Sequence, residues 1–239
     1  MDATESTENH RTRVGALRRE KTRIRLIESA LGVFADKGAD APTIDDFIAA
    51  AGVARGTFYN YFRTTAELLS AVAGESSDEV LAVIDPLVRA IDDPAQRVVV
   101  GSRLYMGMAT RYPLWGAFIT RVGTKRGSRG RLLDEYLTRD LQAGLDAGRF
   151  GAVDVVVARD IALGSIMYGI ETLLSGEAPA DYAEQSMYAL MRAFGIGAKE
   201  ARKLAYAPIA DPPAPRGTIF ERVDAVVEGD AGLHRNATS

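Results

Sequence analysis

Apolar residues recur at three- and four-residue intervals along most of the chain, which is the spacing of one face of an α-helix. Over residues 17–37 this pattern predicts a first helix, which ends before Gly38. Two short helices are expected over 43–50 and 54–60, on either side of a break at Gly52. The apolar positions that define the first helix are Ile24, Ile27, Leu31 and Phe34.

Helical patterns also fill the chain from residue 65 to about residue 196, so the predicted fold is all-α. A fourth helix is expected over 65–83, because Pro86 should bend or break it. Asp93 followed by proline is an N-cap with proline at the first helical position, and Asp154 is a second N-cap. The later helices are expected over 94–111, 113–122, 131–147, 155–174 and 182–196.

The segment ARGTFYNYF, residues 54–62, is the most informative stretch of the chain. Phe58 and Phe62 are four residues apart and suit a buried face, whereas the residues between them carry polar tips. Helix, short helix, glycine-containing turn and short helix is the layout of a helix-turn-helix. The exposed face of its last helix is therefore expected to reach DNA, with tyrosine hydroxyls on phosphates and Asn60 on a base edge. The alternative is that the tyrosines only cover a small hydrophobic domain.

Charge is distributed unevenly along the chain. The net charge is −3, yet residues 11–63 hold ten Lys and Arg against six Asp and Glu. An acidic chain with a basic N-terminal segment is typical of a protein in which one part meets a polyanion. The charge pattern therefore supports DNA as a partner of this segment.

The segment TIDDFIAAAGVARGTFYNYFRTTAELL, residues 43–69, resembles the DNA-binding domain of the TetR family of bacterial transcriptional regulators. The resemblance implies an N-terminal three-helix helix-turn-helix domain, followed by a larger helical domain that binds a small effector and forms a homodimer. It implies a repressor of transcription that acts on double-stranded DNA. The family usually has lysine where Thr65 stands and uses it on a phosphate, a role for which Arg63 is the substitute here.

Several residues are expected to contact DNA. Arg23 and Arg25 on the first helix suit backbone contact or charge steering. The basic segment before Arg18 suits the neutralisation of phosphates or entry into the minor groove, and the alternative is that it is only solvated. The candidates that the resemblance carries over by position are Thr43, Arg55, Gly56, Thr57, Tyr59, Asn60 and Tyr61.

The expected organisation has four parts. Residues 1–16 are a flexible basic arm, 17–64 the helix-turn-helix domain and 65–206 the ligand-binding and dimerisation domain. Residues 207–239 are a proline-rich spacer and a tail with a possible short helix, which begins at a capping box of Thr218 and Glu221. The helices over 155–174 and 182–196 are the dimerising pair that the resemblance implies.

Bulky and adaptable side chains in the middle helices are candidates for an effector pocket, which favours a largely apolar or aromatic ligand with one or two hydrogen bonds. At helical spacing such residues are more often ordinary core. Glu171 shares a face with small and apolar residues and suits a ligand contact, a dimer contact or a solvated edge equally. The candidates are Tyr105, Met108, Trp115, Phe118, Met167, Tyr168 and Glu171.

Other function classes find little support. The chain has no cysteine and its two histidines, His10 and His234, are near its ends, so no enzyme, metal site or cofactor is expected. No apolar run is long enough to span a membrane, and no signal peptide is visible, so a cytoplasmic protein is expected. Alternatives within gene regulation stay open: a constitutive DNA-binding regulator without an effector, or an activator.

Overall fold

A computed structural model describes residues 3–37, 41–122, 131–215 and 219–220. Over these residues the chain is all-helical, as the sequence predicts, and divides into two compact units. The N-terminal unit comprises residues 1–72 with 218–239, and the C-terminal unit comprises 73–217. None of the described helices is long and apolar enough to span a bilayer.

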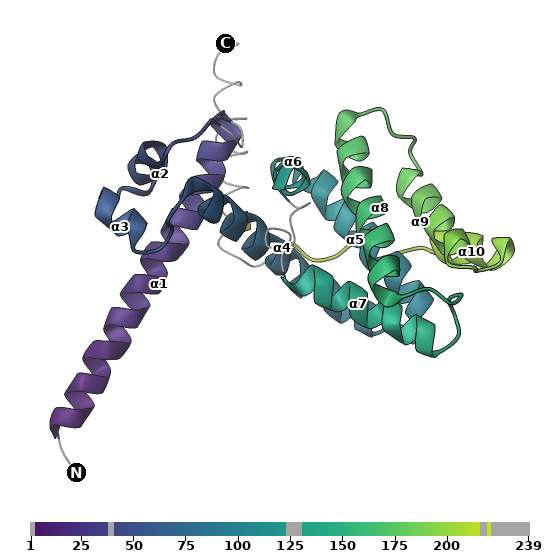
Figure 1. Cartoon of the computed structure of the whole chain (residues 1–239), viewed down its shortest axis with the longest axis horizontal. Helices are drawn as coiled ribbons and strands as arrows, with labels where there is room; N and C mark the ends of the chain where they lie inside the picture. Colours follow the sequence, from purple (N-terminus) through teal and green to yellow (C-terminus); the bar gives the residue numbers. More distant parts are fainter. Residues whose placement is uncertain (1–2, 38–40, 123–130, 216–218, 221–239) are drawn as a thin grey trace. The chain divides into compact units, whose positions relative to one another are not determined.

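The N-terminal unit, called the reader below, contains α1 (Ala3–Lys37), α2 (Ile44–Ala51) and α3 (Arg55–Tyr59) (Figure 1). Its core joins the apolar face of α1 to the phenylalanines of the later helices, with the rings of Phe34 and Phe47 5.0 Å apart. Gly52 ends α2 with a φ of 60°, a conformation that costs glycine least. The buried reader residues include Leu26, Ile27, Ala30, Leu31, Phe34, Phe47, Phe58 and Phe62.

Helix α4 (Thr65–Arg89) begins in the reader and ends in the C-terminal unit. The expected end of the helix at residue 83 is wrong, because α4 continues through Pro86 for three more residues. Proline removes the hydrogen bond to the carbonyl four residues earlier, which belongs to Ala82. Ala82 and Pro86 are both exposed, so water can satisfy that carbonyl and the loss is tolerated.

In the C-terminal unit α5 (Pro94–Arg111) is central and packs against each of the later helices. The side chains of Asp93 and Asp154 accept hydrogen bonds from the backbone N–H groups of Ala95 and Val156, which confirms both predicted N-caps. The later helices are α6 (Pro113–Val122), α7 (Arg131–Asp146), α8 (Val155–Ser175), α9 (Tyr182–Ala193) and α10 (Ala198–Ala205).

The ends of the chain differ from the expected organisation. Residues 3–16, expected as a flexible arm, continue α1 as helix. Helix α10 is a further short helix, whose apolar Ala201, Leu204 and Ala205 are buried. In the tail, Ile219 and Phe220 are buried and belong to the reader, while the rest of the expected C-terminal helix lies outside the described residues.

Candidate DNA-binding surface and effector cavity

The last reader helix has two distinct faces. Phe58 and Phe62 are buried, and their rings lie 6.1 Å apart. Tyr59 is 48% exposed and meets Phe58 edge-on, while Asn60 is exposed at the C-terminal end of α3 and Tyr61 is half-buried. The alternation of aromatic and polar tips in the sequence therefore corresponds to a buried side and a solvent-facing side.

Arg55 is exposed, and its guanidinium is already paired with a carboxylate. Its Nη2 lies 2.5 Å from Oδ1 of Asp45 on α2, and this hydrogen bond is the main reason why the pKa of Arg55 is raised above its ordinary value. A phosphate or guanine that binds this guanidinium must share it with, or take it from, the Asp45 carboxylate. The pair therefore lowers the positive charge that the reader presents at α3.

Thr43 is tied into the start of α2. Its backbone N–H and its hydroxyl both donate to Oδ2 of Asp46, at 2.8 and 2.9 Å, so the Asp46 carboxylate caps the start of α2. Lys37 donates to the other carboxylate oxygen at 2.6 Å. The Lys37 hydrogen bond, with those from Thr43, lowers the pKa of Asp46 from 3.8 to about 2. Thr43 remains exposed, so its hydroxyl oxygen is open to a further donor.

Neither the packing around Gly56 nor its backbone conformation requires a glycine at this position. A Cβ built on it would meet nothing within 4 Å, and its φ does not lie in the left-handed region. Next to it Thr57 is half-buried. The space over Gly56 is open to solvent, which leaves room for another molecule to approach the backbone.

The two arginines predicted on α1 lie on different sides of the helix. Arg23 is half-buried, and its guanidinium lies 5.9 Å from the ring centre of Phe62, on the side that faces the reader core. Arg25 is exposed and, nine residues before Phe34, lies on the opposite side, since each residue turns the helix by about 100°. Beside α4, Arg63 is exposed and its backbone N–H donates to Glu67 at 2.7 Å.

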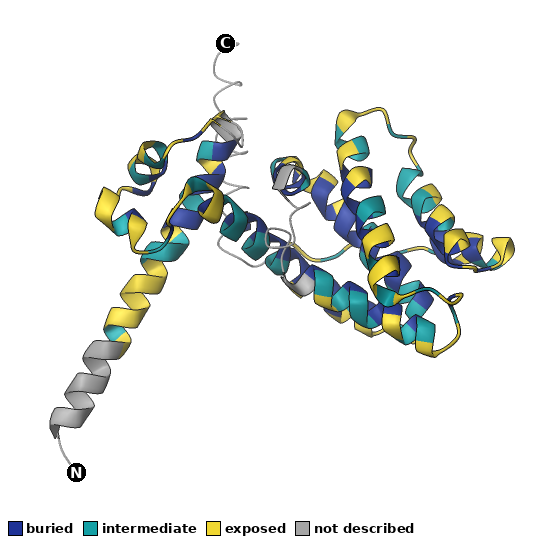
Figure 2. Cartoon of the chain, viewed as in Figure 1, coloured by how far each residue is buried: buried dark blue, intermediate teal, exposed yellow. Residues whose placement is uncertain are grey.

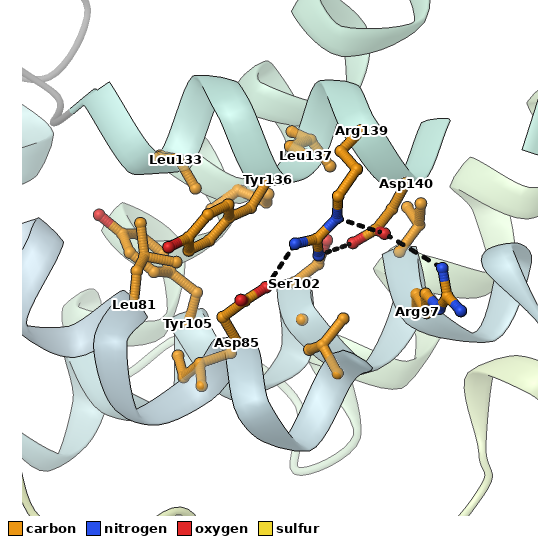
Figure 3. Close-up of a pocket in the computed structure, with 15 residues that line it drawn as sticks. Leu81, Asp85, Arg97, Ser102, Tyr105, Leu133, Tyr136, Leu137, Arg139 and Asp140 are labelled. Atoms are coloured by element: carbon orange, nitrogen blue, oxygen red, sulfur yellow. Dashed lines mark hydrogen bonds and ion pairs between the residues drawn. The ribbon is translucent and has the colours of Figure 1, made fainter. Parts of the chain in front are cut away.

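A small cavity lies inside the C-terminal unit, between α4, α5, α7 and α8 (Figure 3). Its volume is about 40 Å³, which is room for a few water molecules and less than an aromatic ring needs. Its walls are mostly apolar, its charged side chains gather at one end, and the hydroxyl groups of Tyr105 and Tyr136 lie toward the other end (Figure 3). The polar lining residues are Asp85, Arg97, Ser102, Tyr105, Tyr136, Arg139 and Asp140.

Charged side chains form a continuous chain at the polar end of the cavity. Nη1 of Arg139 lies 2.8 Å from Asp85, and Nη2 lies 2.8 Å from Asp140, which in turn lies 3.8 Å from Arg97 (Figure 3). Hydrogen bonding to Asp140 and Asp85 raises the pKa of Arg139 well above its usual range. The hydroxyl oxygen of Ser102 is buried and has no hydrogen-bond partner among the described residues. Such a group is unusual in a folded protein and is available to a ligand.

Two buried hydrogen bonds join α4 to the helices behind the cavity. The Tyr105 hydroxyl lies 3.0 Å from Oγ of Ser77, and Nε1 of Trp115 donates to Oγ of Ser76 at 3.0 Å. The rings of Tyr105 and Trp115 meet edge-on at 5.3 Å. Burial raises the pKa of Tyr105, so this phenol stays neutral. The two hydrogen bonds, from Tyr105 to Ser77 and from Trp115 to Ser76, are called the serine contacts below.

The structure brings together only part of the predicted ligand set. Tyr105 lines the cavity, whereas Trp115, Phe118 and Met167 are buried outside its lining. Met108 lines a separate groove between α5, α9 and residues 209–214. On α8, Tyr168 is 72% exposed and Glu171 is also exposed, so neither lines the cavity. The other five candidates are all buried in the C-terminal unit.

Comparison with known proteins assigns the family. The family model described as "Bacterial regulatory proteins, tetR family" matches residues 26–72, and "Tetracyclin repressor-like, C-terminal domain" matches residues 93–207. The crystal structure of RolR in complex with the ligand resorcinol is 33% identical, with a TM-score of 0.71, over 83% of this chain and 100% of that one. The chain belongs to the TetR family.

Further relatives agree with this assignment. RolR without ligand is 31% identical with a TM-score of 0.68, over 79% of this chain and 99% of that one. FadR from Bacillus subtilis in complex with stearoyl-CoA is 18% identical with a TM-score of 0.57, over 72% and 98%, and shares the fold. The "Uncharacterized HTH-type transcriptional regulator YvdT" of Bacillus subtilis (strain 168) is 39% identical over 49 residues, which are 20% of this chain and a quarter (25%) of that relative's length.

This TetR-family protein is therefore a DNA-binding transcriptional regulator and not an enzyme. Sequence reasoning predicted Tyr105 but missed the other polar residues of the cavity, which are Asp85, Arg97, Ser102, Tyr136, Arg139 and Asp140. One signal for them exists in the sequence. Asp140 follows Leu133 and Leu137 at spacings of seven and three, so a charged residue occupies the buried face of an amphipathic helix.

Proposed function

We propose that this protein is a homodimeric repressor that binds a palindromic operator and is released from it by a small phenolic effector. The main support for the effector is the buried polar end of the cavity. There the carboxylate of Asp85 and the unpartnered hydroxyl of Ser102 lie beside an apolar wall. The reader, the dimer and the effector site each contribute a separate argument.

In the reader, Asn60 is the base-reading residue. Its exposed amide suits the paired donor and acceptor of adenine in the major groove. Tyr59 and Tyr61 carry hydroxyls beside it and suit phosphate oxygens, which fix position without reading sequence. Gly56 allows the duplex to approach the first turn of α3 closely, since nothing occupies the space above it.

The dimer surface is the outer face of α8. Val157, Ile161 and Tyr168 are exposed there at spacings of four and seven, which makes one apolar stripe along the helix. Such a stripe on an otherwise polar surface favours a partner helix, and a second copy supplies the same stripe across a two-fold axis. Two readers related by such an axis require a palindromic operator. Ile161→Arg should convert the dimer into monomers in sedimentation experiments, and Gln142→Arg, at an exposed position of α7 outside the expected dimerising pair, serves as the control.

The effector is a small ring that carries hydroxyl groups. RolR, at 33% identity, is described in complex with resorcinol, a benzene ring with two hydroxyls. In this chain one phenolic hydroxyl can donate to Asp85 and accept from Ser102, while the ring lies against Leu81, Leu133 and other apolar wall residues. The two arginines that line the cavity are each paired with a lining carboxylate, so the site offers a carboxylic acid no unpaired cation, and a phenol fits it better.

Binding must move the walls, because the cavity is smaller than an aromatic ring. Asp85 is on α4 and Arg139 is on α7, so a ring inserted between them separates these helices or displaces the Arg139 side chain. Because α4 is one continuous helix into the reader, its displacement is the route from cavity to DNA. The effector can release DNA only if it binds the displaced arrangement more tightly.

The test measures operator affinity in the presence of resorcinol and of related phenols. We expect a phenol to weaken operator binding by the wild type. A hydrogen bond to a charged group contributes about 1.5–3 kcal/mol, so Asp85→Asn should raise the effective phenol concentration about tenfold or more. Asp146→Asn, at the exposed end of α7, is the matched control. If Asp85→Asn responds like the control, the effector does not bind this carboxylate, and if no phenol acts on the wild type, the effector is not a phenol.

A further inference from the structure

A groove on the reader lies between α1 and the residues that follow α3. It is lined by Gly15, Ala16, Arg19 and Glu20 of α1 and by Tyr61, and it encloses about 420 Å³. We propose that this groove, called the α1 groove below, binds a phosphodiester of the DNA backbone beside the bases read by α3. The donors are the guanidinium of Arg19 and the hydroxyl of Tyr61. The proposal rests on the proposed docking of α3 in the operator.

The floor of the α1 groove is made of the smallest side chains. A Cβ added to Gly15 would meet nothing within 4 Å, and Ala16 is exposed, so no side chain of the described residues covers this part of α1. Glycine costs about 1 kcal/mol relative to alanine inside a helix, so its presence in α1 needs another reason. Close approach of a bulky and rigid group, such as a sugar–phosphate backbone, supplies that reason. Figure 2 shows that this part of α1 is almost wholly exposed.

Charge in the α1 groove is arranged for an anion. Arg19 is exposed and makes no ion pair or hydrogen bond within the described part of the chain. Glu20 would repel a phosphate, but one of its carboxylate oxygens lies 3.9 Å from Nη1 of Arg23, which offsets its charge. Arg23 is in turn placed over the ring of Phe62, next to Tyr61. The guanidinium of Arg19 is thus unpaired within the described part of the chain, whereas the neighbouring Glu20 is paired with Arg23.

The helix geometry separates Arg19 from the other cations of α1. Ala16, Arg19, Glu20 and Arg23 are three or four residues apart and share the side that faces Tyr61. Arg18, Lys21 and Arg25, at spacings of three and four, form a second stripe on the other side. A helix with its side chains is about 10–12 Å wide, which exceeds the screening length of about 8 Å at physiological salt. The second stripe therefore adds little to binding at the α1 groove.

Arg18 is consequently a matched control for Arg19, being the adjacent residue, of the same type and equally exposed. We expect Arg19→Ala to reduce the slope of log affinity against log salt by about 1, and Arg18→Ala to leave it close to the wild-type value. Because phosphate contacts carry no sequence information, the same reduction should appear on random-sequence duplex. Equal slopes for the two variants would overturn the proposal.

A second measurement locates the phosphate. Each backbone phosphate of the operator is replaced in turn by an uncharged methylphosphonate, and affinity is measured for wild type, Arg19→Ala and Tyr61→Phe. We expect one position in each half-site where the wild type loses affinity and Arg19→Ala loses no more. If Arg19→Ala stays as sensitive as the wild type at every position, Arg19 touches no phosphate. Failure of the wild type to select any palindrome, with the Arg19 effect retained on random duplex, would overturn operator recognition and leave the α1 groove intact.

Discussion

Replacement of Tyr105 by phenylalanine and of Ser77 by alanine, singly and together, tests the energetic link between α4 and the cavity. The two hydroxyls lie 3.0 Å apart and both residues are buried. Tyr105→Phe keeps the ring against Trp115 and leaves only Oγ of Ser77 without its partner. A serine hydroxyl within a helix can turn to the carbonyl four residues earlier, so the cost should be near 1 kcal/mol.

Ser77→Ala is expected to cost more than Tyr105→Phe. The phenol hydroxyl of Tyr105 then has no acceptor in a buried position, and its desolvation is uncompensated, at about 2–3 kcal/mol. In the double variant a phenyl ring meets a methyl group, and no polar group is left unpaired. The double variant should therefore be destabilised by about 1 kcal/mol, well below the sum of the single variants, with a coupling of about 2 kcal/mol.

The assay is urea unfolding followed by tryptophan fluorescence. The chain has one tryptophan, and Trp115 lies 5.3 Å from the Tyr105 ring, so the signal comes from the site of the change. The free energies of unfolding of the wild type, the two single variants and the double variant give the coupling energy of a double-mutant cycle. If the double variant equals the sum of the single variants within about 0.5 kcal/mol, the two hydroxyls are not coupled, and this contact does not join α4 to α5.

Three other changes test the reader. Gly56→Ala should stabilise α3 by up to about 1 kcal/mol in thermal unfolding while lowering operator affinity in titrations, and a gain in both would mean that DNA does not approach Gly56. Asp45→Asn should release Arg55 and strengthen binding to all duplexes, with a steeper salt dependence; weaker binding would show that Asp45 positions Arg55 for DNA. The pKa of Asp46 is depressed in the folded state, to about 2 from 3.8, so its contribution to stability is present above pH 4 and lost as the pH falls towards 2. Asp46→Asn should flatten the stability of the reader across this acid range, and unchanged acid unfolding would contradict the assigned role of the carboxylate.

Local signals in the sequence were sufficient for much of the helical architecture. The N-caps at Asp93 and Asp154 and the break at Gly52 depend on the backbone needs of a few neighbouring residues, and each is found where the sequence predicts it. Pro86 was misjudged because the cost of proline depends on what satisfies a carbonyl one turn earlier. The exposure of Ala82 decides that, and sequence alone does not state it.

The cavity of the C-terminal unit was less predictable than the reader, for a physical reason. The reader surface comes from adjacent residues of one short helix, so residues 54–62 contain most of it. The cavity joins Asp85, Ser102 and Arg139, which come from three helices and meet only through tertiary packing. A bulky aromatic such as Trp115 gave a stronger sequence signal than a serine or aspartate, yet it is packed in the core.

The serine contacts also determine what kind of motion α4 can make. Ser76 and Ser77 are successive residues, so their hydroxyls point about 100° apart, and the bonds to Trp115 and Tyr105 oppose both sliding and rotation of the helix. A helix held at one point along its length moves as a lever. At 1.5 Å per residue, Asp85 lies about 12 Å beyond this pivot and Thr65 about 17 Å before it. A displacement of the Asp85 end therefore reappears at Thr65 in the opposite direction and about 1.4 times larger. In the proposed mechanism, a shift of Asp85 by about 1 Å therefore moves the first turn of α4 by about 1.4 Å.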